Sequence, residues 1–278
     1  MKEIKIEDII YKVKDALIDA CINIDPKLLE CIKKARDNEE GLGKSILDQI
    51  IENDELASKI NLPICQDTGI VVAFVEIGNQ VFINGDLNYA INEGVRLAYK
   101  DGYLRKSTLN NPLDRINTMD NLPAIIHVKT CLGDSLKITL CPKGAGSENM
   151  SKVKMLSPSE GIEGVKKFVI DTIKEAGGRP CPPLIVGVGI GGTIEKCALI
   201  AKEALLRPLD DHCEVESGRK LEEELLKEIN ALNIGPMGLK GKTTALSVKV
   251  NLFPCHIASL PVCVNIQCHV SRHKEVIL

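Results

Sequence analysis

Apolar positions recur at helical spacing through the first part of the chain. Between residues 9 and 20, for example, Ile9, Val13, Leu17 and Ala20 would share one face of a helix. Asp25 followed by Pro26 is a helix-start signal, because aspartate caps the helix and proline is favoured at its first position. A further amphipathic run follows from about residue 44 to 59. These patterns predict a helical N-terminal segment over residues 1–60.

After residue 60 the pattern alternates between strand-like and helical runs. The runs IVVAFVEIG, TTALSVKVN and IASLPVCVNIQC predict strands, and residues 86–100, 161–176, 194–206 and 219–232 predict helices. The runs PAIIHVKT and SLKITLCP flank a turn at residues 132–134, which favours a β-hairpin. We therefore expect a mixed α/β fold with mixed β-sheets flanked by helices. No linker or repeat is visible, so one domain is expected, with a core over residues 61–278.

Composition and charge narrow the class of protein. Hydrophobic residues are 44% and charged residues 26% of the chain, which is ordinary for a globular protein. The net charge of −3 gives no support to nucleic-acid binding. The N-terminus lacks the apolar core of a signal peptide, and no stretch looks long and apolar enough to span a membrane. We therefore expect a cytoplasmic protein whose 11 cysteines are reduced thiols and not a disulfide framework.

Three of these cysteines lie in polar or proline-bounded, loop-like contexts. They are Cys65 in PICQDTG, Cys181 in RPCPP and Cys268 in NIQCHVSRH. They lack the close C-x-x-C spacing of zinc ribbons and ferredoxins, and burial as small apolar residues is a real alternative for any of them. Three thiolates from distant loops would suit an iron–sulfur cluster with one open iron. Such an iron can act as a Lewis acid on a substrate oxygen.

Five blocks of the sequence together resemble the alpha part of class I fumarases and L-tartrate dehydratases. In chain order they are PICQDTG, LRKS, KGAGSENMSK, GRPCPPLIVGVGIGGT and SLPVCVNIQCHVSRH, and they span about residues 60–273. The resemblance implies a four-iron four-sulfur (4Fe-4S) cluster whose fourth iron binds substrate. It assigns Cys65, Cys181 and Cys268 as the cluster ligands.

The resemblance also assigns substrate-side residues next to the first cysteine. It implies that Gln66 contacts substrate, that Asp67 transfers the proton, and that Arg105 binds a substrate carboxylate. A guanidinium suits that last role, because it can hold a carboxylate by two parallel hydrogen bonds. Taken without the resemblance, Asp67 with Thr68 and Gly69 reads as an ordinary turn.

Further candidates follow in two other blocks. The resemblance places Gly146, Asn149 and Lys152 on the substrate side, although KGAGSENMSK also reads as an ordinary polar loop. It places His256 in catalysis, supporting a partner group across a subunit interface. A structural role is the competing interpretation of this histidine.

The implied reaction is reversible dehydration of a small dicarboxylic hydroxy acid, with (S)-malate to fumarate as the main expectation. L(+)-tartrate dehydration is the alternative, since it shares the same blocks. The chain ends at Leu278, soon after the last cysteine block. The resemblance therefore implies a separate beta subunit that completes the active site, in a dimer of alpha–beta pairs.

One motif favours a rival function. Gly187, Gly189 and Gly192 satisfy the G-x-G-x-x-G pattern of dinucleotide-binding oxidoreductases, between an apolar run and a helical run. Asp210 and Asp211 lie near the distance expected of the ribose-binding acid, but no second apolar strand precedes them. If the family resemblance holds instead, the helix after these glycines would direct its positive end toward the anionic site. A non-enzymatic zinc or iron–sulfur protein is the third possibility.

Overall fold

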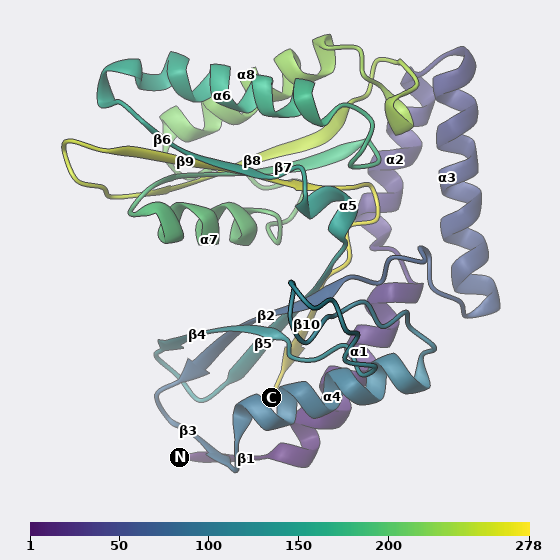
Figure 1. Cartoon of the computed structure of the whole chain (residues 1–278), viewed down its shortest axis with the longest axis vertical. Helices are drawn as coiled ribbons and strands as arrows, with labels where there is room; N and C mark the ends of the chain where they lie inside the picture. Colours follow the sequence, from purple (N-terminus) through teal and green to yellow (C-terminus); the bar gives the residue numbers. More distant parts are fainter. The chain divides into compact units, whose positions relative to one another are not determined.

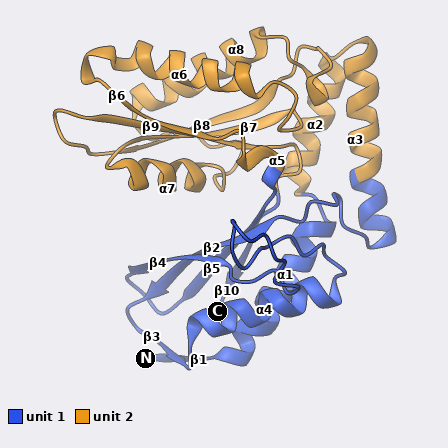
Figure 2. Cartoon of the chain, viewed as in Figure 1, with its two compact units in different colours: residues 1–24, 54–145, 272–278 blue, residues 25–53, 146–271 orange.

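The computed structural model describes residues 1–278, and Figure 1 shows its helices and strands in chain order. The chain divides into two compact units that interleave along the sequence (Figure 2). Unit 1 comprises residues 1–24, 54–145 and 272–278, and unit 2 comprises residues 25–53 and 146–271. The mixed α/β fold is confirmed, with helices packed on mixed sheets. The expected single domain stays a prediction, and the two units are described separately.

The helical N-terminal segment is confirmed as three helices, which are α1 (Ile6–Ile22), α2 (Pro26–Asn38) and α3 (Gly41–Ile60). Asp25 caps α2 as expected, because its carboxylate accepts hydrogen bonds from the backbone N–H groups of Lys27 and Leu28. A short strand before α1 was not predicted. It is β1 (Lys2–Lys5), which pairs in parallel with β3 (Val81–Asn84).

Unit 1 is built on a four-stranded sheet with the order β10-β5-β2-β4. These strands are β2 (Ile70–Gly78), β4 (Ile125–Cys131), β5 (Leu136–Lys143) and β10 (Lys274–Ile277). Helices α1 and α4 (Leu87–Asp101) bury their apolar sides with this sheet in one core. That burial is the main stabilising contribution to the unit.

The predicted hairpin over residues 125–143 is wrong. β4 and β5 do not pair with each other, because β2 lies between them, parallel to β4 and antiparallel to β5. The physical reason lies in burial. β2 is an apolar run with five consecutive buried residues, which suits a central strand, whereas β4 is largely exposed and suits an edge.

Unit 2 contains a second four-stranded sheet with the order β6-β9-β7-β8. Its strands are β6 (Lys152–Leu156), β7 (Leu184–Gly191), β8 (Ala245–Phe253) and β9 (Leu260–Gln267). Two helices cover one face and a third covers the other (Figure 1), and these are α6 (Gly161–Ala176), α8 (Glu216–Ala231) and α7 (Ile194–Ala204). The chain also forms three short helices. α5 (Ala145–Glu148) spans the residues at which unit 1 gives way to unit 2 in the sequence, η1 (Pro158–Glu160) precedes α6, and η2 (Pro236–Gly238) precedes β8.

The glycines of the G-x-G-x-x-G pattern have a packing role in unit 2. Gly187 and Gly189 lie inside β7, and not in a phosphate-binding turn. A β-carbon at these positions would lie 2.2 Å from the carbonyl oxygen of Ala201 and 2.1 Å from that of Cys197. Glycine is therefore required because the backbone of α7 packs directly on the strand. This explanation accounts for the pattern without a nucleotide.

No helix in the structure combines the length and the apolar character that a membrane span requires.

Candidate active site

The first cysteine loop lies in unit 1, between α3 and β2. The backbone N–H of Ile64 donates to the carbonyl of Cys21 on α1 (2.9 Å), which fixes the start of the loop. Cys65 is half-buried, and its Sγ accepts a hydrogen bond from the backbone N–H of Asp67 at 3.4 Å.

Asp67 is held by both of its carboxylate oxygens. Oδ1 accepts a hydrogen bond from the backbone N–H of Gly69 (3.1 Å), which is the contact expected if Asp67 forms an ordinary turn with Thr68 and Gly69. Oδ2 accepts from the backbone N–H of Ala145 (2.8 Å), far along the chain. These two hydrogen bonds from backbone donors orient the carboxylate.

The turn that follows Asp67 is supported by Tyr99, a fully buried tyrosine that was not a candidate in the sequence analysis. The hydroxyl of Tyr99 on α4 lies 2.6 Å from the carbonyl oxygen of Thr68 and 3.0 Å from that of Gly69. Burial raises the pKa of Tyr99 well above its usual range, so the hydroxyl stays a donor. In the sequence this tyrosine is one more apolar position of an amphipathic helix. Its supporting role depends on tertiary contacts.

Arg105 lies beside the same turn. Its carbonyl oxygen accepts a hydrogen bond from the hydroxyl of Thr68 (2.8 Å), and its exposed guanidinium approaches the Gln66 side-chain oxygen at 3.5 Å. Unit 1 therefore gathers a thiol, an amide, a carboxylate and a cation from positions 65, 66, 67 and 105. This set can bind a carboxylated substrate and exchange a proton with it.

The other two cysteine loops adjoin each other in unit 2. β7 and β9 pair so that Ile185 lies opposite Gln267, which places the residues before β7 beside those after β9. The carbonyl oxygen of Cys181 lies 3.4 Å from the backbone nitrogen and 3.0 Å from Nδ1 of His269. Cys181 itself has a φ of 56°, a strained conformation of the kind found at functional sites.

The 146–152 loop is tied to the same end of β9. The hydroxyl of Ser151 accepts from the backbone N–H of Ile266 (3.1 Å), and Glu148 accepts from the side-chain amide of Asn265 (3.3 Å). Gly146 and Asn149 are exposed beside these anchors. The ammonium of Lys152 forms an ion pair with Glu175 of α6. The predicted substrate contacts of Gly146, Asn149 and Lys152 stay predictions.

His256 lies at the opposite end of the unit 2 sheet from Cys268. It sits on the loop between β8 and β9, and the eight residues of β9 separate it from the cysteine. At roughly 3.3 Å per residue that is a distance of about 25 Å. The imidazole Nδ1 accepts from the backbone N–H of Ala258 (3.1 Å), so the neutral ring carries its proton on Nε2. The exposed imidazole borders a pocket of about 710 Å³.

The start of α7 shares this pocket with His256, since Gly192 and Ile194 also line it. Within unit 2, and contrary to expectation, α7 therefore does not direct its positive end toward the loops of Cys181 and Cys268. β7 begins near Cys181, so the helix that follows β7 begins at the other end of the sheet.

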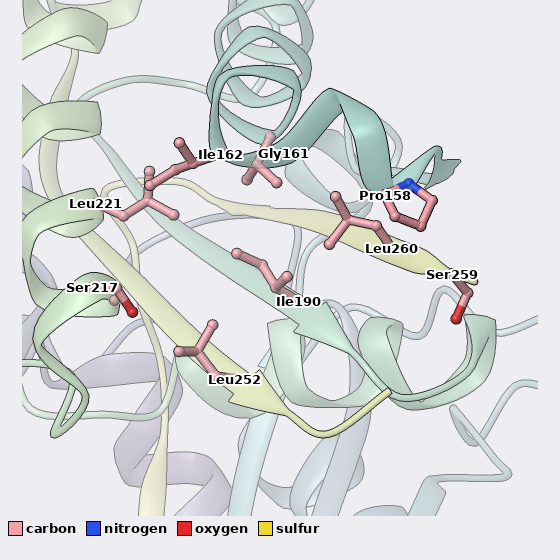
Figure 3. Close-up of a pocket in the computed structure, with 11 residues that line it drawn as sticks. Pro158, Gly161, Ile162, Ile190, Ser217, Leu221, Leu252, Ser259 and Leu260 are labelled. Atoms are coloured by element: carbon pink, nitrogen blue, oxygen red, sulfur yellow. The ribbon is translucent and has the colours of Figure 1, made fainter. Parts of the chain in front are cut away.

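A second pocket in unit 2 is apolar and has a volume of about 280 Å³ (Figure 3). Its side chains come from the start of α6 and α8 and from the ends of β7, β8 and β9. They include Ile162, Ile190, Leu221, Leu252 and Leu260, with Ser217 and Ser259 as the side-chain hydroxyls. None of the lining residues titrates near neutral pH. This pocket therefore lacks an acid–base group and a metal ligand.

The donor set fits an iron–sulfur cluster in chemical type. All three loop cysteines are free thiols and half-buried, and two of their loops adjoin in unit 2. Neither unit by itself holds three or more His, Cys, Asp or Glu side chains close enough to bind a metal ion. Cys65 belongs to unit 1, whereas Cys181 and Cys268 belong to unit 2.

Comparison with known proteins identifies similar sequences. The family model described as Fumarate hydratase (Fumerase) matches residues 10–277. A Methanocaldococcus jannaschii protein with the provisional name L(+)-tartrate dehydratase subunit alpha is 42% identical over 276 residues, covering 96% of this chain and 95% of that protein. The L(+)-tartrate dehydratase alpha subunits of Escherichia coli K12 and Shigella sonnei are each 30% identical over 256 residues, covering 90% of this chain and 84% of theirs.

Proposed function

Because the chain belongs to the class I fumarate hydratase family, we propose that it is the cluster-bearing alpha subunit of a dehydratase whose substrate is L(+)-tartrate. The chain is a hydro-lyase of the fumarate hydratase and tartrate dehydratase alpha-subunit family. The substrate assignment follows the names of the relatives. It replaces the expectation of malate, which stays the second candidate because the family description names fumarate hydratase.

One observation carries the proposed chemistry. Unit 1 places the carboxylate of Asp67 and the guanidinium of Arg105 around the loop of a candidate ligand, Cys65. A dicarboxylic hydroxy acid needs a cation for a carboxylate and a base for the C3 proton. This loop supplies both from neighbouring positions.

The proposed roles follow from the contacts. Asp67, held by the N–H groups of Gly69 and Ala145, accepts the C3 proton while its orientation is kept. Arg105 binds a substrate carboxylate, and Gln66 beside it contributes an amide to the same surface. Gly146, Asn149 and Lys152 are proposed to contact the rest of the substrate.

We assign Cys65, Cys181 and Cys268 as ligands of a 4Fe-4S cluster, which supports a Lewis-acid function toward the substrate hydroxyl when bound. The support is the family membership and the fact that all three are free thiols on loops. Keeping them reduced fits a reducing compartment such as the cytoplasm.

A separate beta subunit completes the proposed enzyme, in a dimer of alpha–beta pairs. The relatives are named as alpha subunits, which is the support for a partner of this kind. The position of His256 agrees with it. This exposed imidazole lies far from the cysteine loops of its own unit, and we propose that it supports a catalytic group of the beta subunit.

The test is an anaerobic assay of the reconstituted alpha–beta complex with L(+)-tartrate, D-tartrate and (S)-malate. Dehydration of malate gives an alkene, whereas dehydration of tartrate gives an enol that becomes a keto acid, so the products are distinguishable. We expect the highest kcat/KM with L(+)-tartrate, and negligible turnover by the isolated chain. A preference for malate would overturn the substrate assignment alone. Absence of turnover with all three acids, despite an intact cluster, would overturn the proposed function.

A further inference from the structure

The side chain of Gln267 lies against the sulfur of Cys268. Gln267 is the last residue of β9, and only 2% of its surface is exposed. Its Nε2 lies 3.0 Å from the carbonyl oxygen of Val270 and 3.7 Å from the Sγ of Cys268. The amide nitrogen therefore reaches both the sulfur and the backbone of the loop that presents it.

The orientation of this amide follows from its neighbours. The carbonyl oxygen of Val270 is an acceptor only, so the atom 3.0 Å away must be the nitrogen of the amide and not its oxygen. A side-chain NH2 group has two hydrogens. One is donated to Val270, and the other is available to the sulfur of Cys268.

The opposite end of the amide shows that the fold alone does not explain this residue. Oε1 of Gln267 is buried and has no hydrogen-bond partner. A buried acceptor without a partner destabilises the protein, and an apolar side chain of similar length would avoid that cost. The N–H side of the amide is the part that makes contacts, and one of them is to the candidate ligand.

We propose that Gln267 is a positioning residue for the iron–sulfur cluster, donating an N–H hydrogen bond to the Cys268 thiolate. The inference rests on the proposed function, since it takes Cys268 as a ligand. A ligating cysteine has lost its thiol proton, so its sulfur is an anionic acceptor. Hydrogen bonds to cluster sulfurs withdraw charge from them and raise the reduction potential, and partners behind a ligand also hold it in place.

Asn265 provides a matched control on the same strand. It is two residues before Gln267 and therefore on the same face of β9, its exposed fraction is 4%, and its Oδ1 is also buried without a partner. Its amide nitrogen donates to Glu148 and not to a cysteine. Replacing either residue by leucine removes one buried amide with an unpaired oxygen, but only one of the two changes a contact to sulfur.

The experiment compares Gln267→Leu and Asn265→Leu in the anaerobically reconstituted alpha–beta complex. A redox titration followed by electron paramagnetic resonance gives the potential of the one-electron reduction of the cluster, with dithionite as the reductant. We expect a lower potential and faster loss of iron for Gln267→Leu, and wild-type values for Asn265→Leu. Gln267→Met is a second variant of nearly the same length, for the case in which leucine impairs folding, and should lower the potential likewise.

The outcomes separate this inference from the function on which it rests. A wild-type complex without a cluster would overturn both. A normal wild-type cluster whose potential is the same in Gln267→Leu and Gln267→Met would overturn the role of Gln267 and leave the hydro-lyase proposal standing. An equal shift in Asn265→Leu would also overturn it, because the effect would then follow from loss of any buried amide on this strand.

Discussion

Tyr99→Phe tests whether the buried hydroxyl supports the turn that follows Asp67. The substitution removes one hydroxyl from a fully buried side chain and leaves the ring in place. A phenol has a single proton, and the shorter of its two contacts, 2.6 Å, is to the carbonyl of Thr68. The carbonyl of Gly69 keeps a second donor in the amide of Asn121 (3.1 Å), so the main loss falls on Thr68.

The expected loss in free energy of unfolding comes from the carbonyl of Thr68, which is left without its donor. Leaving one buried acceptor without its donor costs about 1–3 kcal/mol. For a chain of this size each kcal/mol lowers the unfolding temperature by about 2–4 °C, which gives a shift of roughly 2–12 °C. Because burial raises the pKa of Tyr99, the phenol keeps its proton through neutral and mildly alkaline pH. The shift should therefore be the same at pH 6 and pH 9.

Thermal unfolding of the purified chain, followed by circular dichroism, measures this effect. Tyr89→Phe is the matched control, because Tyr89 lies on the same helix with 55% of its surface exposed. It should leave the unfolding temperature unchanged. If Tyr99→Phe destabilises the chain no more than Tyr89→Phe does, the Tyr99 hydroxyl does not support the turn.

Three further substitutions test the proposed base, the packing of α7 on β7, and the charge of a partly buried carboxylate. Asp67→Asn should lower kcat per intact cluster by about a hundredfold or more with little change in KM, as expected for loss of a general base. Near-normal turnover per cluster would show that Asp67 only stabilises the turn. Gly189→Ala should prevent stable folding or strongly lower the unfolding temperature, because the new methyl would overlap the backbone of α7; an unchanged temperature would contradict the packing explanation. Burial opposes ionisation of Asp211, but hydrogen bonds from Arg207 and Lys249 outweigh it and lower its pKa. Asp211→Asn should therefore lower the denaturant midpoint at pH 7, and the difference should shrink below about pH 4, where the ionised carboxylate no longer contributes; a constant difference would show that charge is not involved.

Local patterns predicted the helices well because their signals are local. The cap at Asp25 and the amphipathic runs of α1, α6 and α8 need only neighbouring residues to be recognised. The sheet order failed for the opposite reason. The turn at residues 132–134 looks like a hairpin turn, and only the competition for a buried central position places β2 between β4 and β5.

Some residues of the candidate site were likewise predictable from local sequence, and others were not. The loops carrying Cys65, Cys181 and Cys268 were recognisable from their sequence blocks, and the structure brings Gln66, Asp67 and Arg105 to one turn of unit 1. His256 lies at the other end of the unit 2 sheet from Cys268. This position follows from the direction of β9, which the residues around His256 do not encode. Tyr99 looks like an ordinary apolar position of a helix, because folding alone brings it to Thr68. Gln267 looks like an ordinary strand position, because its contact with Cys268 depends on the conformation of the loop after β9.

The iron content of cysteine variants tests whether Cys65, Cys181 and Cys268 bind the cluster. Each of Cys65→Ser, Cys181→Ser and Cys268→Ser is reconstituted anaerobically and compared with wild type by iron and sulfide analysis and by visible absorption. Cys131→Ser and Cys31→Ser are controls, because both are partly buried free thiols in units 1 and 2 respectively and neither is an assigned ligand. We expect about four irons per chain in wild type and both controls, as for a cubane cluster, and loss of most of the iron in Cys65→Ser, Cys181→Ser and Cys268→Ser. Full retention of the cluster in any of those three would contradict the ligand assignment.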